Sequence, residues 1–159
     1  MTVSVLMVCT GNICRSPMAE GLLLHLLPES LKPLVSVRSA GTHGLYGNRA
    51  EPFAVRAVSA HRADISGHRA RILDAAMVRS SDLVLAMENY HMDKINGLLF
   101  FRCKHARLLG TFAPQRENPE IEDPYGLPYD AYETAAKEIL SCMPGLMDHI
   151  RRQVDMKAS

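Results

Sequence analysis

The chain has 159 residues, a length typical of one domain that buries its own hydrophobic core. Apolar residues make up 47% of the chain and charged residues 22%, as in an ordinary soluble globular protein. The 18 basic and 17 acidic side chains nearly cancel and leave a formal net charge of +1. Overall charge therefore points neither to nucleic acid nor to an anionic membrane surface, and any affinity for an anion must come from a local site.

Targeting signals and cysteine spacing indicate the compartment. No apolar stretch is long enough to span a bilayer, and residues 1–8 lack the basic start and the small-residue cleavage site of a secretory signal. The four cysteines are few and irregularly spaced, unlike a disulfide framework. We therefore expect a cytoplasmic protein without stable membrane insertion, in which at least one thiol is reactive.

The predicted elements alternate between strands and helices. Residues 3–8 are short, β-branched and apolar, as in a buried parallel strand, and residues 15–27 predict a helix with leucines on one face. Later strands are expected at residues 34–38, 82–86 and 106–109, a long loop at 112–128, and helices at 52–61, 74–78, 88–98 and 129–152, the last with a bend at Pro144. This alternation predicts a single α/β domain over residues 1–159 with a parallel sheet and right-handed crossovers.

The loop after the first strand holds the least ordinary residues of the chain. Residues 9–16 read Cys-Thr-Gly-Asn-Ile-Cys-Arg-Ser and lie where ligands bind in such sheets, beyond the carboxyl end of a strand. Gly11 permits a tight turn, and successive amides at the start of a helix form a nest for an anion. The guanidinium of Arg15 suits two oxygens of one phosphoryl group, and Cys9 in this positive potential is expected to ionise and attack phosphorus. The predicted phosphate-binding residues are Thr10, Gly11, Asn12, Ile13, Cys14 and Arg15.

The spacing of this loop makes the interpretation specific. A Cys-x5-Arg pattern alone recurs by chance in many proteins. Here it stands between an apolar strand and an apolar-faced helix, and Ser16 follows it directly. That context favours a phosphate-binding loop over an incidental turn between a strand and a helix.

Residues 8–17 resemble the signature of the low-molecular-weight protein-tyrosine phosphatases, in the bacterial form similar to enzymes that act on tyrosine kinases of exopolysaccharide export. Further blocks resemble the family in the same order, at residues 39–42, 67–71, 82–88 and 122–125. The resemblance implies a four-stranded parallel sheet of order 2-1-3-4 with helices on both faces. It also implies hydrolysis of phosphotyrosine and other aryl phosphate monoesters through a cysteinyl-phosphate, without a cofactor. The implied partner is a phosphotyrosine protein, with a bacterial tyrosine kinase as a candidate. We expect a monomer or weak oligomer that, given its near-zero net charge, binds no nucleic acid.

The resemblance also implies roles for single residues. Cys9 matches the nucleophile and Arg15 the phosphate-binding arginine, while Ser16 matches a hydrogen-bond donor to the thiolate. Asn12 would hold the loop in a strained shape, supported by Ser39 and His68.

Asp123 is the predicted general acid and base. A phenolate leaves far better when a carboxylic acid protonates it as it departs, and Pro124 restricts Asp123 towards an extended conformation that projects the carboxyl group. From the residues alone, an Asp-Pro pair in a polar loop is usually a turn, and only the loop at Cys9 and the family order favour catalysis. Glu120 and Glu122 lie close by as competing acids.

Several smaller signals leave alternatives open. Cys14 is interpreted either as a small buried residue or, as the family implies, as a redox partner that forms a protective disulfide with Cys9, and the two roles are compatible. Leu45 and Tyr125 are candidates for the wall of a substrate pocket. The cysteine and histidine spacings fit structural zinc poorly, so no metal is expected. A last set is interpreted as solvated surface or as a contact for an acidic phosphopeptide: Arg62, Arg69, Arg71, Lys94, Arg102, Lys104 and Arg107.

Other functions compete with hydrolysis. An arsenate reductase on the same fold needs further cysteines near the third strand, and the chain has none there before Cys103. A non-catalytic phosphate-binding module would not need Cys9, Arg15 and Asp123 together. A nucleotide-binding loop would end in Gly-Lys-Ser/Thr, which is absent here.

Overall fold

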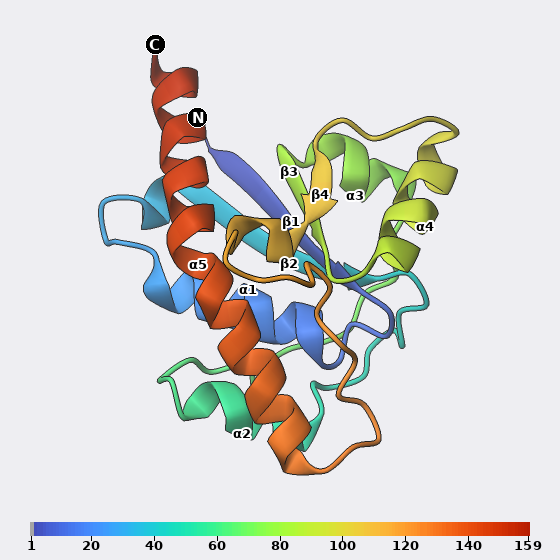
Figure 1. Ribbon diagram of the computed structural model, residues 1–159. Coiled ribbons are helices and arrows are strands. Elements are labelled where there is room, and N and C mark those ends of the chain that lie inside the picture. The colour runs from blue at the N-terminus through green and yellow to red at the C-terminus, as the bar shows by residue number, and fades with distance from the viewer. Residues whose placement is uncertain (1) are drawn as a thin grey trace.

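Four parallel strands form the centre of the protein in a computed structural model that describes residues 2–159 (Figure 1). Their order is β2-β1-β3-β4, which confirms the predicted order 2-1-3-4. The strands are β1 (Val3–Cys9), β2 (Val35–Gly41), β3 (Leu83–Ala86) and β4 (Ala106–Leu108). Because all four run in the same direction, their carboxyl ends lie along one edge of the sheet.

Side chains alternate along the central strand and build a core on each face. Val5 and Met7 of β1 belong to the larger core, and Leu6 and Val8 belong to the smaller one. Helices therefore cover both faces of the sheet, as expected (Figure 1). The larger core includes residues of α1 (Arg15–Leu26), α2 (Pro52–Ser59) and α5 (Tyr129–Ala158), and the smaller core includes residues of α3 (Ala75–Ser80) and α4 (Asn89–Leu99); two short 3₁₀ helices are η1 (Lys32–Leu34) and η2 (Leu109–Phe112).

The last helix is longer than the sequence pattern predicts. It continues to Ala158 rather than to about residue 152, and it passes through Pro144 without interruption. Its end is tied to the sheet, because Lys157 Nζ donates to the carbonyl of Thr2 and to Asp82 Oδ2, both at 2.8 Å. None of the helices described for residues 2–159 is both long and apolar enough to cross a membrane.

Candidate active site

The loop between β1 and α1 is enclosed by the segment that follows β2. The amides of Thr42, His43 and Leu45 donate to the carbonyls of Cys9, Thr10 and Gly11, at 2.9, 2.9 and 3.1 Å. These bonds direct the loop's carbonyl oxygens away from its centre, which leaves the amide side to face an anion. Gly41 at the end of β2 makes the close approach possible, since a Cβ there would lie 2.3 Å from the oxygen of Thr10.

Asn12 holds the loop in its turn. Its φ angle of +59° is in the left-handed region, which residues other than glycine rarely adopt, and its side chain is fully buried. Asn12 Nδ2 donates to Ser16 Oγ at 2.8 Å, and Asn12 Oδ1 accepts from the amide of Arg71 at 2.8 Å. His68 Nε2 donates to the carbonyl of Asn12 at 2.7 Å. Hydrogen bonds to Ser16 and to the segment 68–71 therefore maintain this conformation.

Ser16 connects Asn12 to the sulfur of Cys9. Ser16 Oγ lies 2.9 Å from Cys9 Sγ and already accepts a hydrogen bond from Asn12. A hydroxyl has one proton, so the proton of Ser16 is free to point at the sulfur. A donor in that position stabilises a thiolate, and the first turn of α1, which starts at Arg15, adds positive potential to the same place.

Arg15 is buried at the base of the loop, with 1% of its surface exposed. Its Nη1 donates to the carbonyl of Ile121 at 2.7 Å and lies 3.2 Å from Glu88 Oε2, while Nη2 lies 3.5 Å from Asp123 Oδ2. Its Nε is buried without a hydrogen-bond partner among residues 2–159. One edge of the guanidinium is thus held by the protein, and the buried Nε remains available to an anion.

A cavity of about 310 Å³ opens above the loop. The predicted nucleophile, arginine and acid all contribute to it, together with both residues predicted for the pocket wall. Asp123 is fixed at its rim, because Asp123 Oδ1 accepts from the amide of Tyr125 at 3.1 Å. The lining residues are Cys9, Thr10, Gly11, Ile13, Cys14, Arg15, His43, Leu45, Asp123 and Tyr125.

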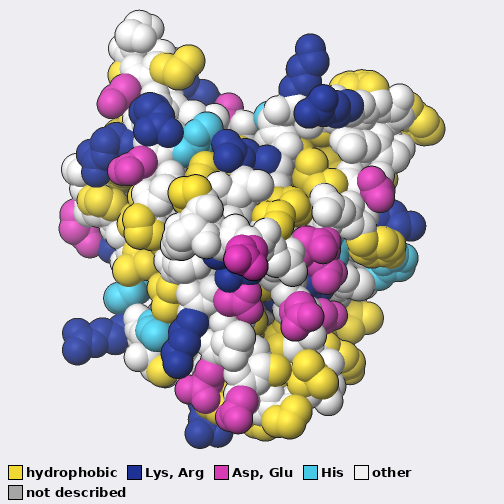
Figure 2. All heavy atoms as spheres, viewed as in Figure 1, with side chains coloured by type: hydrophobic (Ala, Val, Ile, Leu, Met, Phe, Trp, Pro, Cys, Tyr) yellow, Lys and Arg dark blue, Asp and Glu magenta, His cyan; other side chains and the backbone are white. Residues whose placement is uncertain are grey.

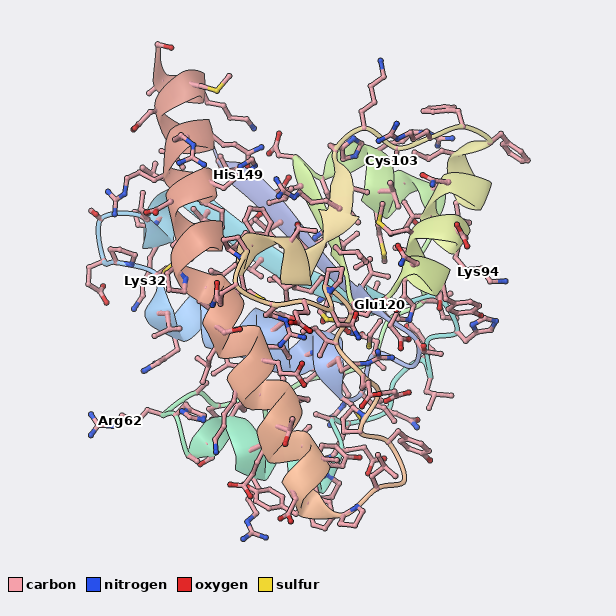
Figure 3. The ribbon with its side chains drawn as sticks, viewed as in Figure 1. Lys32, Arg62, Lys94, Cys103, Glu120 and His149 are labelled. Carbon is pink, nitrogen blue, oxygen red and sulfur yellow. The ribbon has the colours of Figure 1, made fainter. Side chains whose placement is uncertain are left out.

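The competing acids lie outside this cavity. Glu120 Oε2 accepts from the amide of Asn89 at 2.8 Å, at the start of α4, and Figure 3 shows Glu120 beside that helix end. Glu122 is exposed and does not line the cavity. Of the three neighbouring carboxylates, Asp123 alone reaches both the cavity and Arg15.

Ser39, which the family resemblance implies as a support for Asn12, makes its side-chain hydrogen bond to another residue. Ser39 Oγ donates to Glu20 Oε1 at 2.5 Å, and the two residues line a separate hollow of about 960 Å³ on the other side of the loop. His68 also lines that hollow and does reach Asn12. This larger hollow contains neither Cys9 nor Arg15, so its size does not mark the reactive centre.

Cys14 differs from Cys9 in its surroundings. Burial raises the pKa of the Cys14 thiol to about 12, even though a hydrogen bond with Tyr132 acts in the opposite direction. Cys14 Sγ donates to the hydroxyl of Tyr132 at 3.7 Å. Burial therefore favours the neutral form of the Cys14 thiol, although Cys14 lines the same cavity as Cys9.

His91 and Glu88 are site residues that the sequence did not reveal. His91 is fully buried, and its Nδ1 accepts from the amide of Glu88 at 3.1 Å. The ring proton is therefore on Nε2, which donates to Thr10 Oγ1 at 2.8 Å, next to the nucleophile. Burial, and next the charge of Arg15, lower the pKa of His91 to about 4, so the ring is neutral. In the sequence, the spacing Glu88-x-x-His91 after the third strand fits a capping box, and this pattern could have indicated that the two residues interact.

Comparisons with known proteins agree on one family. A family model described as low molecular weight phosphotyrosine protein phosphatase matches residues 4–156. The low molecular weight protein-tyrosine-phosphatase Etp of Escherichia coli (strain K12) is 41% identical over 130 residues, 82% of each chain.

Solved structures match over nearly the whole chain. The crystal structure of the Erwinia amylovora tyrosine phosphatase AmsI gives a TM-score of 0.81 at 32% identity, covering 94% of this chain and 93% of that one. The YwlE arginine phosphatase from Geobacillus stearothermophilus gives a TM-score of 0.82 at 30% identity, covering 95% and 94%. With the loop geometry and the sheet order, these matches show that the chain belongs to the low-molecular-weight phosphotyrosine protein phosphatase family.

Proposed function

We propose that the protein hydrolyses phosphotyrosine in proteins through a cysteinyl-phosphate on Cys9. The observation that carries this proposal is the chain of hydrogen bonds from Asn12 through Ser16 to Cys9 Sγ, at the start of α1 and next to the buried Arg15. It supports a thiolate that is already directed at the centre of an anion-binding loop. The proposal uses no cofactor.

Arg15 binds the phosphoryl group in this proposal. Glu88 and the carbonyl of Ile121 hold Nη1, so the guanidinium cannot turn away from the loop. Nε and Nη2 then donate to two phosphoryl oxygens in the paired arrangement that arginine offers to phosphate. The phosphoryl group takes the place of Asp123 beside Nη2 and leaves the carboxyl group next to the phosphoryl oxygens.

The first chemical step transfers the phosphoryl group to sulfur. The Cys9 thiolate attacks phosphorus, an S–P bond forms, and the bond from phosphorus to the phenolic oxygen breaks. The electron pair of that bond stays on the phenolic oxygen, which takes a proton from Asp123 and leaves as tyrosine. As charge returns to sulfur in the second step, the hydroxyl of Ser16 stabilises the leaving thiolate.

The second step regenerates the enzyme with water. Asp123, now a carboxylate, accepts a proton from a water molecule as its oxygen attacks phosphorus. The S–P bond breaks, its electron pair returns to Cys9 as thiolate, and inorganic phosphate is released. One carboxyl group thus serves as acid and then as base, and the proton count closes over the cycle.

The cavity wall favours an aromatic leaving group. Ile13, Leu45 and Tyr125 present apolar surface above the loop. When the phosphoryl group binds in the loop, the phenyl ring attached to it can pack against these side chains. The partner we propose is therefore a protein with a phosphorylated tyrosine, and a bacterial tyrosine kinase is a candidate. All four cysteines are free, and a nucleophilic thiol needs a reducing compartment, so we propose the cytoplasm.

Two substitutions test the chemistry. Cys9→Ser should abolish turnover of para-nitrophenyl phosphate while inorganic phosphate still binds. Asp123→Asn should slow phenyl phosphate, whose leaving group needs a proton, by about 100-fold or more, and should slow para-nitrophenyl phosphate much less, because general acid catalysis contributes on that scale. The measurement is kcat/KM against the acidity of the leaving phenol, at several pH values.

Matched controls identify the residues that act. Cys14→Ser removes the neighbouring neutral thiol and should keep most of the activity, and Glu122→Gln removes the adjacent exposed carboxylate and should change little. An active Cys9→Ser enzyme would overturn the assignment. So would a dependence of kcat/KM on the acidity of the leaving phenol that Glu122→Gln alters and Asp123→Asn does not. Phosphoarginine serves as a comparison substrate, since one similar structure is named an arginine phosphatase. Faster turnover of phosphoarginine than of phosphotyrosine peptides would overturn the proposed substrate.

A further inference from the structure

The connection between α4 and β4 exposes two adjacent aromatic rings. Phe100 is 94% exposed and Phe101 is 64% exposed, although each ring could bury a large apolar area. The connection enters β4 at the amino end of the sheet, whereas Cys9 lies at the carboxyl end of β1 (Figure 1). Adjacent exposed rings of this kind are characteristic of surfaces that bind something.

The same connection carries unpaired positive charge. Residues 100–105, which form the connection, include Arg102 and Lys104 and no Asp or Glu. Arg102 and Lys104 are exposed, and with Arg79 of α3 and Phe101 they line one hollow of about 500 Å³. None of these three cations takes part in an ion pair with the residues that the structure describes. Figure 2 shows dark blue and yellow side chains projecting together at the upper right, over this connection.

The backbone at Phe100 is strained as well. Its φ angle is +62°, and it follows the last residue of α4, a position where glycine is strongly preferred. Glycine would relieve the strain and also remove an exposed ring from water. A bulky aromatic residue kept in such a place indicates a function outside the fold itself.

We propose that this aromatic–basic tip, formed by Phe100, Phe101, Arg102, Lys104 and Arg79, binds the surface of an anionic phospholipid bilayer. The rings enter the interface between headgroups and acyl chains, and the cations stay with the lipid phosphates. Two rings offer roughly 300 Å² of apolar contact, while a stable protein interface needs about 800 Å² from each partner. A bilayer deforms around a small projecting tip and needs no such area.

This orientation leaves the active site open. The tip is at the amino end of the sheet and the cavity above Cys9 is at the carboxyl end, so a bilayer at the tip faces away from the cavity. The bound enzyme presents the cavity to protein segments that extend from the membrane into solution. The inference rests on the tip alone and stands whether or not the proposed chemistry is correct.

Vesicle sedimentation with the full chain tests the proposal. The protein should bind vesicles of phosphatidylcholine with phosphatidylglycerol, should bind pure phosphatidylcholine vesicles far more weakly, and should be released by salt. Arg102→Gln and Lys104→Gln should each weaken binding about five-fold, the effect of one cation near an anionic surface. Phe100→Gly and Phe101→Ser should each weaken it by about ten-fold or more.

Matched controls separate the tip from general surface effects. Arg62→Gln removes an exposed cation that Figure 3 shows at the lower left, away from the tip. Tyr46→Ser removes an aromatic ring that is 78% exposed and does not belong to the tip. Both should bind vesicles like wild type. Turnover of soluble para-nitrophenyl phosphate by the tip variants should equal that of wild type.

Three results would overturn the proposal. One is equal binding to vesicles with and without phosphatidylglycerol. The second is equal loss of binding in the Arg62→Gln control and the tip variants. The third is binding to soluble polyglutamate that depends on the tip, with no binding to vesicles, since the tip would then be a contact for an acidic protein.

Discussion

Two residues at opposite ends of the sheet adopt nearly the same left-handed conformation. Asn12 has a φ angle of +59° and Phe100 has a φ angle of +62°. Asn12 is fully buried, and its side-chain oxygen, side-chain nitrogen and carbonyl all have partners. Phe100 is 94% exposed, and little of its side chain packs against the fold.

The difference shows that one kind of strain has two different origins. Around Asn12 the surrounding hydrogen bonds are strong enough to hold the unfavourable backbone, and the shape of the anion-binding loop depends on it. Around Phe100 the fold gains nothing from the side chain. The same substitution, to glycine, should therefore have opposite consequences at the two positions.

Asn12→Gly should have the largest effect. Glycine accepts the positive φ angle without steric cost, so the main change is the loss of the bond that Asn12 donates to Ser16 and of the bond that it accepts from Arg71. Loss of one buried and one partly buried hydrogen bond, with the Arg71 amide left without its acceptor, should lower the free energy of unfolding by roughly 3 kcal/mol. Displacement of Ser16 should lower kcat/KM by about 100-fold.

Denaturant unfolding and initial rates measure these two changes. Asn12→Asp is the matched control, because it keeps an acceptor for the amide of Arg71 but has no donor for Ser16. It should recover part of the stability and little of the activity. An Asn12→Gly enzyme with wild-type rates would show that the loop holds its shape without this side chain.

His91 tests the buried network on the other side of the loop. His91→Gln can still place a donor near Thr10 Oγ1, whereas His91→Asn is too short to do so and keeps only the acceptor for the amide of Glu88. If the hydrogen bond to Thr10 orients the loop, His91→Asn should lower kcat/KM about ten-fold and His91→Gln only about two-fold. Equal loss in both variants would instead assign His91 to packing.

The pH dependence of stability provides an independent measurement. The pKa of His91 is lowered from 6.5 to about 4 in the folded protein, so below pH 6.5 the unfolded chain takes up a proton that the folded chain does not. Above pH 6.5 the neutral His91 contributes fully to the free energy of unfolding. That contribution is lost as the pH falls towards 4, by roughly 3 kcal/mol at most. The free energies of unfolding of wild type and His91→Asn should therefore converge over that interval. A constant difference would contradict a neutral buried ring.

The sequence predicted the parts of the site that are contiguous in the chain. Cys9 and Arg15 belong to one turn between a strand and a helix, and their spacing predicts a phosphate-binding loop without knowledge of the fold, whereas the role of Ser16 came from the family resemblance. The strand order 2-1-3-4 came from the family resemblance, and the alternating elements agreed with it.

Contacts between distant segments could not be predicted. Glu88 reaches Arg15, and His91 reaches Thr10, only because β3 pairs beside β1 and brings the start of α4 to the loop. The family resemblance assigned Ser39 to Asn12, and nothing in the sequence shows that its hydroxyl binds Glu20 instead. Local propensity says little about such pairings, because the packing of the sheet determines them.

Phe100→Gly should have the smallest effect on the folded protein, and it should be a gain. Relief of the left-handed conformation contributes about 1 kcal/mol, and the greater freedom of glycine in the unfolded chain offsets part of it, so stability should rise by about 0.5 kcal/mol. Arg62→Gly is the matched control, because Arg62 is also exposed and has a φ angle of +68°. Thermal unfolding of both variants should show a small rise in Tm with unchanged kcat. A clear loss of stability at Phe100 alone would mean that the ring packs against the protein in solution, and the contrast with Asn12 would then fail.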